Sequence, residues 1–193
     1  FFRRSVLQIR RNIQLGRDVD LNDRPKERIK QTLLVALGQS KMVRRPVAGF
    51  FHILIYVGFV LINIEVLEIL IDGLFGTHRV FASPLGGIYN TAIAFFEWLA
   101  LGVLIACVVF LFRRYVQKIP RFTMREMKGW PTKDATIILF VEIVLMGALL
   151  QMNAAEQVLQ SRGEMAAHGS FPVSSWFVPV YSGLSSTTLH LLE

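Results

Sequence analysis

Polar side chains that could do chemistry stand inside a long apolar run from Gly49 to Asp72. His52 lies near its start, and Glu65, Glu68 and Asp72 follow at spacing i, i+3 and i+7. A neutral imidazole inside a bilayer needs a partner, and a haem iron held by axial histidines is a common one. The three carboxylates share one helix face and are candidates for a proton path or an ion site.

Each of these residues also has a purely structural interpretation. His52 could be hydrogen-bonded to a neighbouring helix, because polar pairs between membrane helices are common. The three carboxylates could be paired inside the bundle or at the membrane boundary. For two further carboxylates in apolar runs, Glu97 and Glu142, the sequence does not favour one role over another.

The apolar run is long enough to cross a bilayer. About 20 residues span the hydrocarbon core at about 1.5 Å per residue, and residues 88–112 and 135–152 also qualify. The hydrophobic share of 53% is too high for an ordinary soluble domain of 193 residues. The sequence therefore predicts an all-α integral membrane helix bundle with three complete transmembrane helices. We expect a cytoplasmic basic segment over 1–46, the transmembrane region over 47–153, and an outer loop leading into a further helix over 154–193.

Basic residues are unevenly distributed between the segments that flank these helices. Of the 21 Lys and Arg residues, 12 precede the first span and seven lie between the second and third; the other two are Arg79 and Arg162. Basic loops stay in the cytoplasm, so residues 1–46 and 113–134 are predicted to be cytoplasmic. The net charge of +7 then reflects topology rather than nucleic-acid binding. The basic face could bind an acidic soluble partner or anionic lipid.

The amino-terminal segment is charged and helix-like. Arginines alternate with apolar residues at helical spacing from Arg3 to Ile13, which is typical of a helix on a membrane surface or of a solvated helix. Asp23 is predicted to cap a second helix that has Pro25 in its first turn. Residues 18, 20 and 22 have the opening spacing of a calcium-binding loop, but the glycine and glutamate that such a loop requires are missing, so a turn is the better interpretation.

The remaining histidines limit how a haem could be held. His78 and His168 are predicted to lie in outer loops, about a membrane thickness from His52, so neither can share an iron with it. His190, a weaker candidate ligand, also lies near the outer side if residues 174–188 form a loop, which their Pro, Gly, Ser and Thr content favours. A second axial ligand would then come from sequence beyond Glu193 or from another chain. The chain begins without Met and ends in an opening helix, so we expect it to be part of a longer protein.

Four stretches carry a resemblance to a known family: residues 38–81, 95–114, 127–135 and 149–156. They resemble the membrane domain of bacterial iron-sulfur oxidoreductases, which are similar to electron-transfer-flavoprotein:menaquinone oxidoreductases and to heterodisulfide-reductase-like proteins. That membrane domain in turn resembles the gamma subunit of respiratory nitrate reductase. The resemblance covers essentially the whole chain.

The resemblance implies a five-helix haem b domain in the bacterial cytoplasmic membrane. Such a domain exchanges electrons between menaquinone and cytoplasmic iron-sulfur clusters, with a soluble carrier such as electron-transfer flavoprotein docking on the cytoplasmic side. Phe51, His52 and Ile53 match the first of two haem-ligand positions in the nitrate reductase relatives, whereas Ile62 stands at the second and cannot bind iron. The single cysteine, Cys107, means that iron-sulfur clusters belong to missing sequence or to a partner.

Two competing hypotheses keep the membrane architecture without haem. In one, the chain is an anchor or a proton- or ion-conducting subunit that uses its intramembrane carboxylates. In the other, it is a structural scaffold. The first predicts that carboxylate substitutions abolish function while His52→Gln is tolerated.

Overall fold

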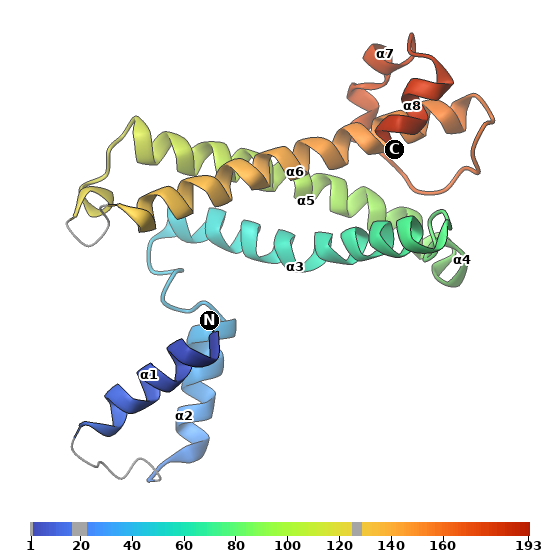
Figure 1. Ribbon diagram of the computed structural model, residues 1–193. Coiled ribbons are helices and arrows are strands. Elements are labelled where there is room, and N and C mark those ends of the chain that lie inside the picture. Colours follow the sequence, from blue (N-terminus) through green and yellow to red (C-terminus); the bar gives the residue numbers. More distant parts are fainter. Residues whose placement is uncertain (1, 17–22, 125–128) are drawn as a thin grey trace. The chain divides into compact units, whose positions relative to one another are not determined.

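The computed structural model describes residues 2–16, 23–124 and 129–193, and these residues form helices and turns without a strand (Figure 1). They divide into two compact units, Phe1–Arg44 and Arg45–Glu193, which are described separately. The prediction of an all-α bundle is confirmed, because three helices are long and apolar enough to cross a membrane.

The amino-terminal unit contains α1 (Phe2–Gln14) and α2 (Pro25–Thr32), which continues into a π-helical turn, η1 (Leu33–Leu37). The prediction that Asp23 caps α2 is wrong. Arg24 is the N-cap residue without a side-chain hydrogen bond, and the Asp23 carboxylate instead pairs with the Arg28 guanidinium at 3.0 Å. The calcium-like spacing at 18, 20 and 22 lies outside the described residues.

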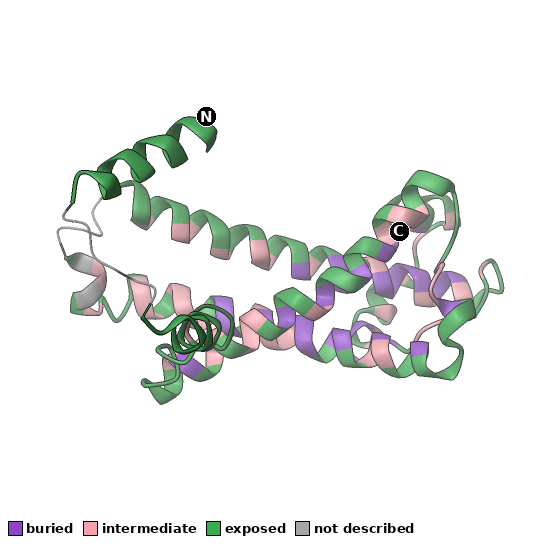
Figure 2. Ribbon diagram, turned by 90° about the horizontal axis from the view of Figure 1, so that it is seen from below, coloured by how far each residue is buried: buried purple, intermediate pink, exposed green. Residues whose placement is uncertain are grey.

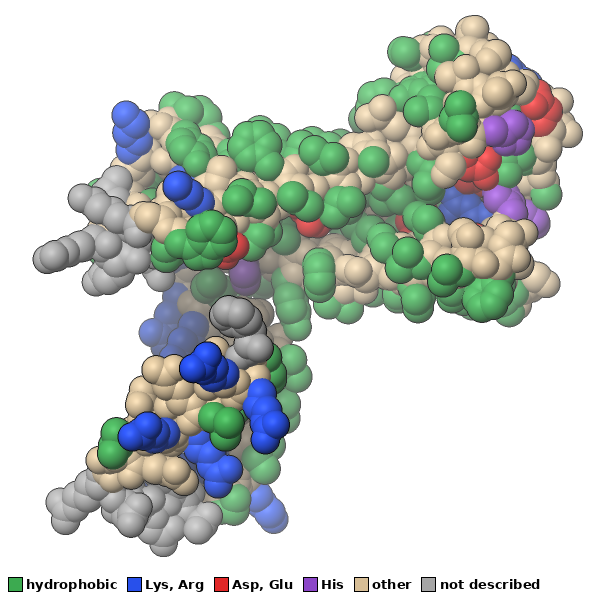
Figure 3. Space-filling view, viewed as in Figure 1, with side chains coloured by type: hydrophobic (Ala, Val, Ile, Leu, Met, Phe, Trp, Pro, Cys, Tyr) green, Lys and Arg blue, Asp and Glu red, His purple; other side chains and the backbone are tan. Residues whose placement is uncertain are grey.

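The second unit is built on three long helices, α3 (Pro46–Phe75), α5 (Gly87–Tyr115) and α6 (Trp130–Ser161). Helix α5 packs against both of the others, and it is the most buried: 39% of its most apolar window is enclosed, against 22% for α3 and 17% for α6 (Figure 2). On the face seen in Figure 3, hydrophobic side chains cover most of the length of this bundle. A bilayer is the solvent that such a surface requires.

Small residues bring α3 and α5 close together. A Cβ atom at Gly58 would lie 2.4 Å from the Val103 side chain, and one at Gly102 would lie 3.2 Å from Leu54. Because lipid tails are as apolar as the helices, close packing of this kind is what favours helix association in a membrane.

After α6, the described residues contain no further helix that is long and apolar enough to cross a membrane. Helix α6 itself runs nine residues beyond the predicted span, because Asn153 and Glu156 turn inward while Ala154, Ala155 and Leu159 are buried. Short elements follow: η4 (Ser174–Trp176), α7 (Val178–Tyr181) and α8 (Ser186–Leu192). Helix α8 packs on α6, at the end of the bundle that also carries α4 (Ala82–Leu85). The short helix η2 (Pro120–Thr123) is at the opposite end, between α5 and α6.

Candidate functional site

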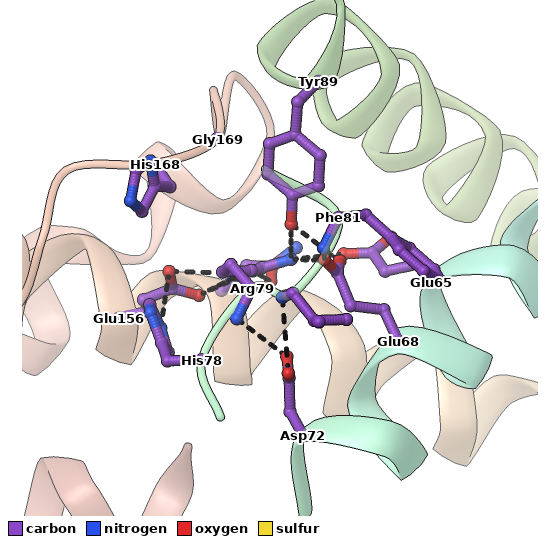
Figure 4. A network of polar contacts seen from close by, with 12 residues as sticks. Glu65, Glu68, Asp72, His78, Arg79, Phe81, Tyr89, Glu156, His168 and Gly169 are labelled. Carbon is purple, nitrogen blue, oxygen red and sulfur yellow. Dashed lines mark hydrogen bonds and ion pairs between the residues drawn. The ribbon is translucent and has the colours of Figure 1, made fainter. Parts of the chain in front are cut away.

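A buried guanidinium organises the end of the bundle where α3 and α6 finish. Arg79, in the connection between α3 and α5, is only 5% exposed. Its Nη2 lies 2.5 Å from Glu156 Oε2 and 2.9 Å from Asn153 Oδ1, both on α6. Its Nη1 lies 3.3 Å from Glu65 Oε1 on α3 and 3.2 Å from the Tyr89 hydroxyl on α5. One side chain therefore links all three long helices (Figure 4). We call the following residues the Arg79 cluster: Glu65, Glu68, Asp72, His78, Arg79, Tyr89, Asn153 and Glu156.

The end of α3 places Arg79 in this position. Gly76 ends the helix with a left-handed φ of 66°, and Arg79 itself has a φ of 52°, which is uncommon for a residue with a side chain. Asp72 stabilises the turn because its carboxylate accepts hydrogen bonds from the backbone N–H of Arg79 at 2.7 Å and of Val80 at 3.3 Å. The turn directs the guanidinium back into the bundle instead of into solvent.

The three carboxylates predicted to share one face of α3 do so, and each has a defined partner. Glu65 contacts Arg79. Glu68 accepts hydrogen bonds from the Tyr89 hydroxyl at 2.7 Å and from the backbone N–H of Phe81 at 2.8 Å. Asp72 holds the turn. These contacts give the three residues a structural role, and the role as a proton path stays a prediction.

The charges of the cluster do not balance. Glu65, Glu68 and Glu156 are each 1% exposed, and Arg79 is the only buried guanidinium within the described residues. Burial by itself would lower the pKa of Arg79, but the neighbouring Glu156 carboxylate raises it above its ordinary value. Glu65 Oε2 is buried without a hydrogen-bond partner in the described part of the chain. Even with His78 protonated beside Glu156, two cations face three enclosed carboxylates, so the cluster can hold exchangeable protons.

A row of ion pairs connects the cluster to the surface. His78 Nε2 lies 3.4 Å from Glu156 Oε1 and 3.3 Å from Glu193 Oε1, and His190 Nδ1 lies 3.5 Å from Glu193 Oε2. His190 is about half exposed on α8. Titratable groups thus follow one another from the exposed His190 to the buried Glu156 at distances short enough for proton exchange, directly or through one water. In Figure 3, acidic, basic and histidine side chains lie next to one another at this end of the bundle, while most of the basic side chains in view lie elsewhere.

A pH dependence of stability follows from His78. Its hydrogen bond to Glu156 raises the pKa of His78 above the usual value near 6.5. The stabilising contribution is therefore fully present below that value and is lost as the pH rises through the folded-state pKa. We expect the thermal stability advantage of the unchanged protein over His78→Gln to shrink between pH 6 and pH 9. The same advantage at both pH values would contradict this prediction.

Glu97 on α5 has a separate and structural task. It is fully buried, and its carboxylate accepts hydrogen bonds from the backbone N–H of Val173 at 2.8 Å, from Ser174 N–H at 3.2 Å, and from the Ser174 hydroxyl. Asn153 donates a fourth hydrogen bond at 3.2 Å. Glu97 therefore fixes the loop that follows α6 onto the bundle.

Replacing Glu97 by Gln should loosen that loop. The amide has one acceptor oxygen, and its NH₂ group faces donors, so at least one buried N–H loses its partner at a cost of about 1–3 kcal/mol. We expect faster protease cleavage between residues 162 and 177 in Glu97→Gln than in the unchanged protein. Thr136→Val on α6, far from this loop in the sequence and bonded to Tyr115, serves as the control and should cleave at the original rate.

His52 lies at the other end of the bundle. It is half-buried in the second turn of α3, about 35 Å along that helix from Phe75. His78 and His190 contact Glu193 near the Arg79 cluster, and the His168 segment lies beside the start of α5, where Gly169 N–H donates to Asn90. The structure therefore does not bring His190 or any other described histidine to His52. Among the described residues, no group of three or more His, Cys, Asp or Glu side chains is arranged to hold a metal ion.

A groove lies between α3 and α6, and Leu192 of α8 also lines it. Its volume is about 360 Å³, and its walls are apolar except for Asn63 on α3 and Glu142 on α6. His52 lies on the same face of α3 as Phe59, Asn63 and Val66, which line the groove at spacings of 7, 11 and 14 residues. Ile69 and Met152 line both this groove and a polar cavity of about 230 Å³ beside Arg79, so the two spaces adjoin.

Sequence reasoning missed the centre of the site. Arg79 was counted only as one of two basic residues in the outer segments, and Glu156 fell beyond the predicted end of the third span. Two signals could have found them. A lone arginine in a segment otherwise depleted of Lys and Arg needs an explanation, and the Ala-rich stretch around Glu156 continues the helical pattern.

Comparison with known proteins gives one relative. The chain is 25% identical over 173 residues, 90% of its length, to the probable iron-sulfur-binding oxidoreductase FadF of Bacillus subtilis (strain 168). The chain spans 22% of the length of FadF. No protein-family model matches the chain, and no solved structure matches it. Through nearly all of its length, the chain is thus similar to one part of an iron-sulfur-binding oxidoreductase.

Proposed function

We propose that this chain is the membrane electron-transfer part of a quinone-linked iron-sulfur oxidoreductase. The observation that carries the proposal is the similarity to FadF along 90% of the chain, because it covers the three membrane helices together with their polar residues. Iron-sulfur clusters would be held by other sequence of the same protein or by a partner, since Cys107 is the only cysteine here. Menaquinone is the proposed membrane-soluble substrate.

His52 is the proposed axial ligand of a haem b. The described residues fit one axial ligand: an imidazole half-buried on a membrane helix, on the face that lines the α3/α6 groove. A haem held there would supply one-electron transfer between the clusters and the quinone. The second axial ligand, if there is one, would come from another helix, because the other described histidines lie at the opposite end of the bundle.

The Arg79 cluster is the proposed proton-handling part of the same module. Quinone reduction consumes protons and quinol oxidation releases them, so the site needs groups that exchange protons with the aqueous phase. Glu65 and Glu156 are enclosed around one guanidinium, and His78 links Glu156 toward the exposed His190 through Glu193. Arg79 keeps the carboxylates in place while the number of bound protons changes.

The proposed orientation puts residues 1–46 and 113–134 in the cytoplasm of a bacterium. Contacts of the two outer arginines support it. Arg79 is enclosed by its cluster, and Arg162 donates to the carbonyls of Ser182 and Leu184 at 2.9 Å. Both arginines make contacts within the fold, so neither marks its segment as cytoplasmic. The cytoplasmic side would then receive the iron-sulfur domain and a soluble carrier such as electron-transfer flavoprotein on a basic surface.

A pyridine-haemochrome spectrum of the protein purified intact from membranes, taken with its mass, tests the proposal. We expect b-type absorption and a mass well above the 21.9 kDa of this chain. Menaquinol should then reduce the haem. Protein of full helix content without any b-type absorption would refute the haem assignment.

A haem-free proton- or ion-conducting subunit is the second candidate, and the uneven charge of the Arg79 cluster favours it. The two proposals differ in which residues they require. If the chain conducts protons without haem, Glu65→Gln should abolish proton uptake into proteoliposomes, and His52→Gln should leave it unchanged. If the chain transfers electrons through haem, His52→Gln should abolish the reduction of the haem by menaquinol.

A further inference from the structure

Glu142 has an unusual environment for a carboxyl group. It lies on α6 about 18 Å from the start of that helix, deep in the membrane-spanning part. The described part of the chain offers it no hydrogen-bond or ion-pair partner, whereas Glu65, Glu68, Glu97 and Glu156 each have at least one. Its side chain lines the α3/α6 groove. Ionisable groups at this depth normally face a partner or a functional pathway.

The groove around Glu142 has the size and polarity of a ligand site. Its volume of about 360 Å³ lies within the usual range for small-molecule pockets, which are mostly apolar with a few polar groups. Asn63 is the second polar residue in its wall. The Asn63 Nδ2 donates one hydrogen to the carbonyl of Phe59 at 2.5 Å, and the amide keeps a second hydrogen and its oxygen for another partner.

We propose that this groove binds the ring of a quinone, with Glu142 and Asn63 as its hydrogen-bond partners. The inference rests on the proposed function and names the site at which its substrate binds. Phospholipid head groups stay at the membrane surface, so they do not reach a carboxyl at this depth, whereas a quinone carries a polar ring on an apolar tail and moves within the bilayer. A carboxyl group suits both redox states, because it donates to a quinone carbonyl when protonated and accepts from a quinol hydroxyl when ionised.

Neighbouring features agree with this placement. His52 lies on the same face of α3 as the groove residue Asn63, about 16 Å from it along the helix. At its other end the groove adjoins the polar cavity beside Arg79 through Ile69 and Met152. The ring would therefore lie between the proposed electron carrier and the proposed proton-handling cluster.

Equilibrium binding of menaquinone-4 to the intact protein in lipid nanodiscs tests the site, with empty nanodiscs as the blank. Glu142→Leu removes the carboxyl at similar volume, and Ala148→Phe fills the groove from its wall. We expect each to weaken binding by about tenfold or more. Val144→Phe, on the exposed side of α6 and not in the groove wall, is the matched control and should bind as the unchanged protein does.

Each alternative gives a different result. Two results would overturn the inference. In the first, the protein binds no more quinone than empty nanodiscs do. In the second, Glu142→Leu and Ala148→Phe bind quinone as tightly as the unchanged protein does. If the groove is instead covered by a helix with a polar partner for Glu142, Glu142→Leu should lower thermal stability and leave quinone binding unchanged, which also overturns it. Haem content is measured on the same samples. If haem is present and the two variants bind quinone unchanged, the quinone site alone is refuted. If haem is absent and quinone binds at the groove, the proposed haem alone is refuted.

Discussion

Arg79→Met should destabilise the protein more than any other single substitution of a charged residue considered above. The change removes the one guanidinium that is buried among the described residues, leaves Glu65 without a cation, and leaves Glu156 with only the partly exposed His78. Breaking a buried ion pair from one side costs about 3–5 kcal/mol. We expect a large fall in the midpoint of thermal unfolding in detergent, together with poor recovery from membranes.

Arg162→Met is the matched control for this substitution. Arg162 lies at the same end of the bundle, but it is exposed and donates to carbonyls that can turn to water instead. Its loss should cost much less. If Arg162→Met lowers the unfolding midpoint as far as Arg79→Met does, the buried charge is not the cause.

Removing carboxylates should rescue the arginine variant. A buried ionic group replaced as a whole by neutral residues is often no less stable than the original. We therefore expect Glu156→Gln and Glu65→Gln, each added to Arg79→Met, to restore part of the lost stability, and both together to restore most of it. Glu156→Gln in the unchanged protein should destabilise it, because it removes the carboxylate that lies nearest to the guanidinium. A substitution that raises stability in the Arg79→Met background and lowers it in the unchanged protein is the result expected of a charge cluster.

The membrane spans and the carboxylate face could be predicted because they depend on local pattern. A run of apolar residues over Gly49–Asp72 has few other stable arrangements, and the spacing of Glu65 to Asp72 puts their side chains on one face of any helix. Helix length was less predictable. The end of α6 depends on whether Asn153 and Glu156 find partners, and these partners come from α5 and from the loop at Arg79.

The roles of Glu97 and Glu142 show what sequence pattern leaves open. Each is a single carboxylate inside an apolar run, so the two are alike in sequence. In the fold, Glu97 meets the backbone donors of the loop at Val173 and Ser174, more than 70 residues away along the chain. Glu142 meets only the groove. The difference arises from contacts between distant segments, which local periodicity does not encode.

His52→Ala should remove the haem from the intact protein. An axial imidazole coordinates the iron through a ring nitrogen, and alanine offers no replacement. We expect the b-type absorption in a pyridine-haemochrome spectrum to fall to background at unchanged protein concentration, and exogenous imidazole to restore part of it. His78→Ala and His190→Ala should both retain the haem, because these residues lie near the Arg79 cluster, at the opposite end of the bundle from His52.

The three histidine variants separate the remaining interpretations of His52. Haem lost only in His52→Ala identifies the ligand and places the cofactor at the end of the groove away from Arg79. Haem lost only in His190→Ala would move the cofactor to the outer end and would turn His52 into a residue that pairs with a neighbouring helix. A full haem content in all three variants would assign both axial positions to groups other than these three histidines. In that case the bundle would contribute the quinone groove and the proton-handling Arg79 cluster, and His52 would have no part in iron ligation.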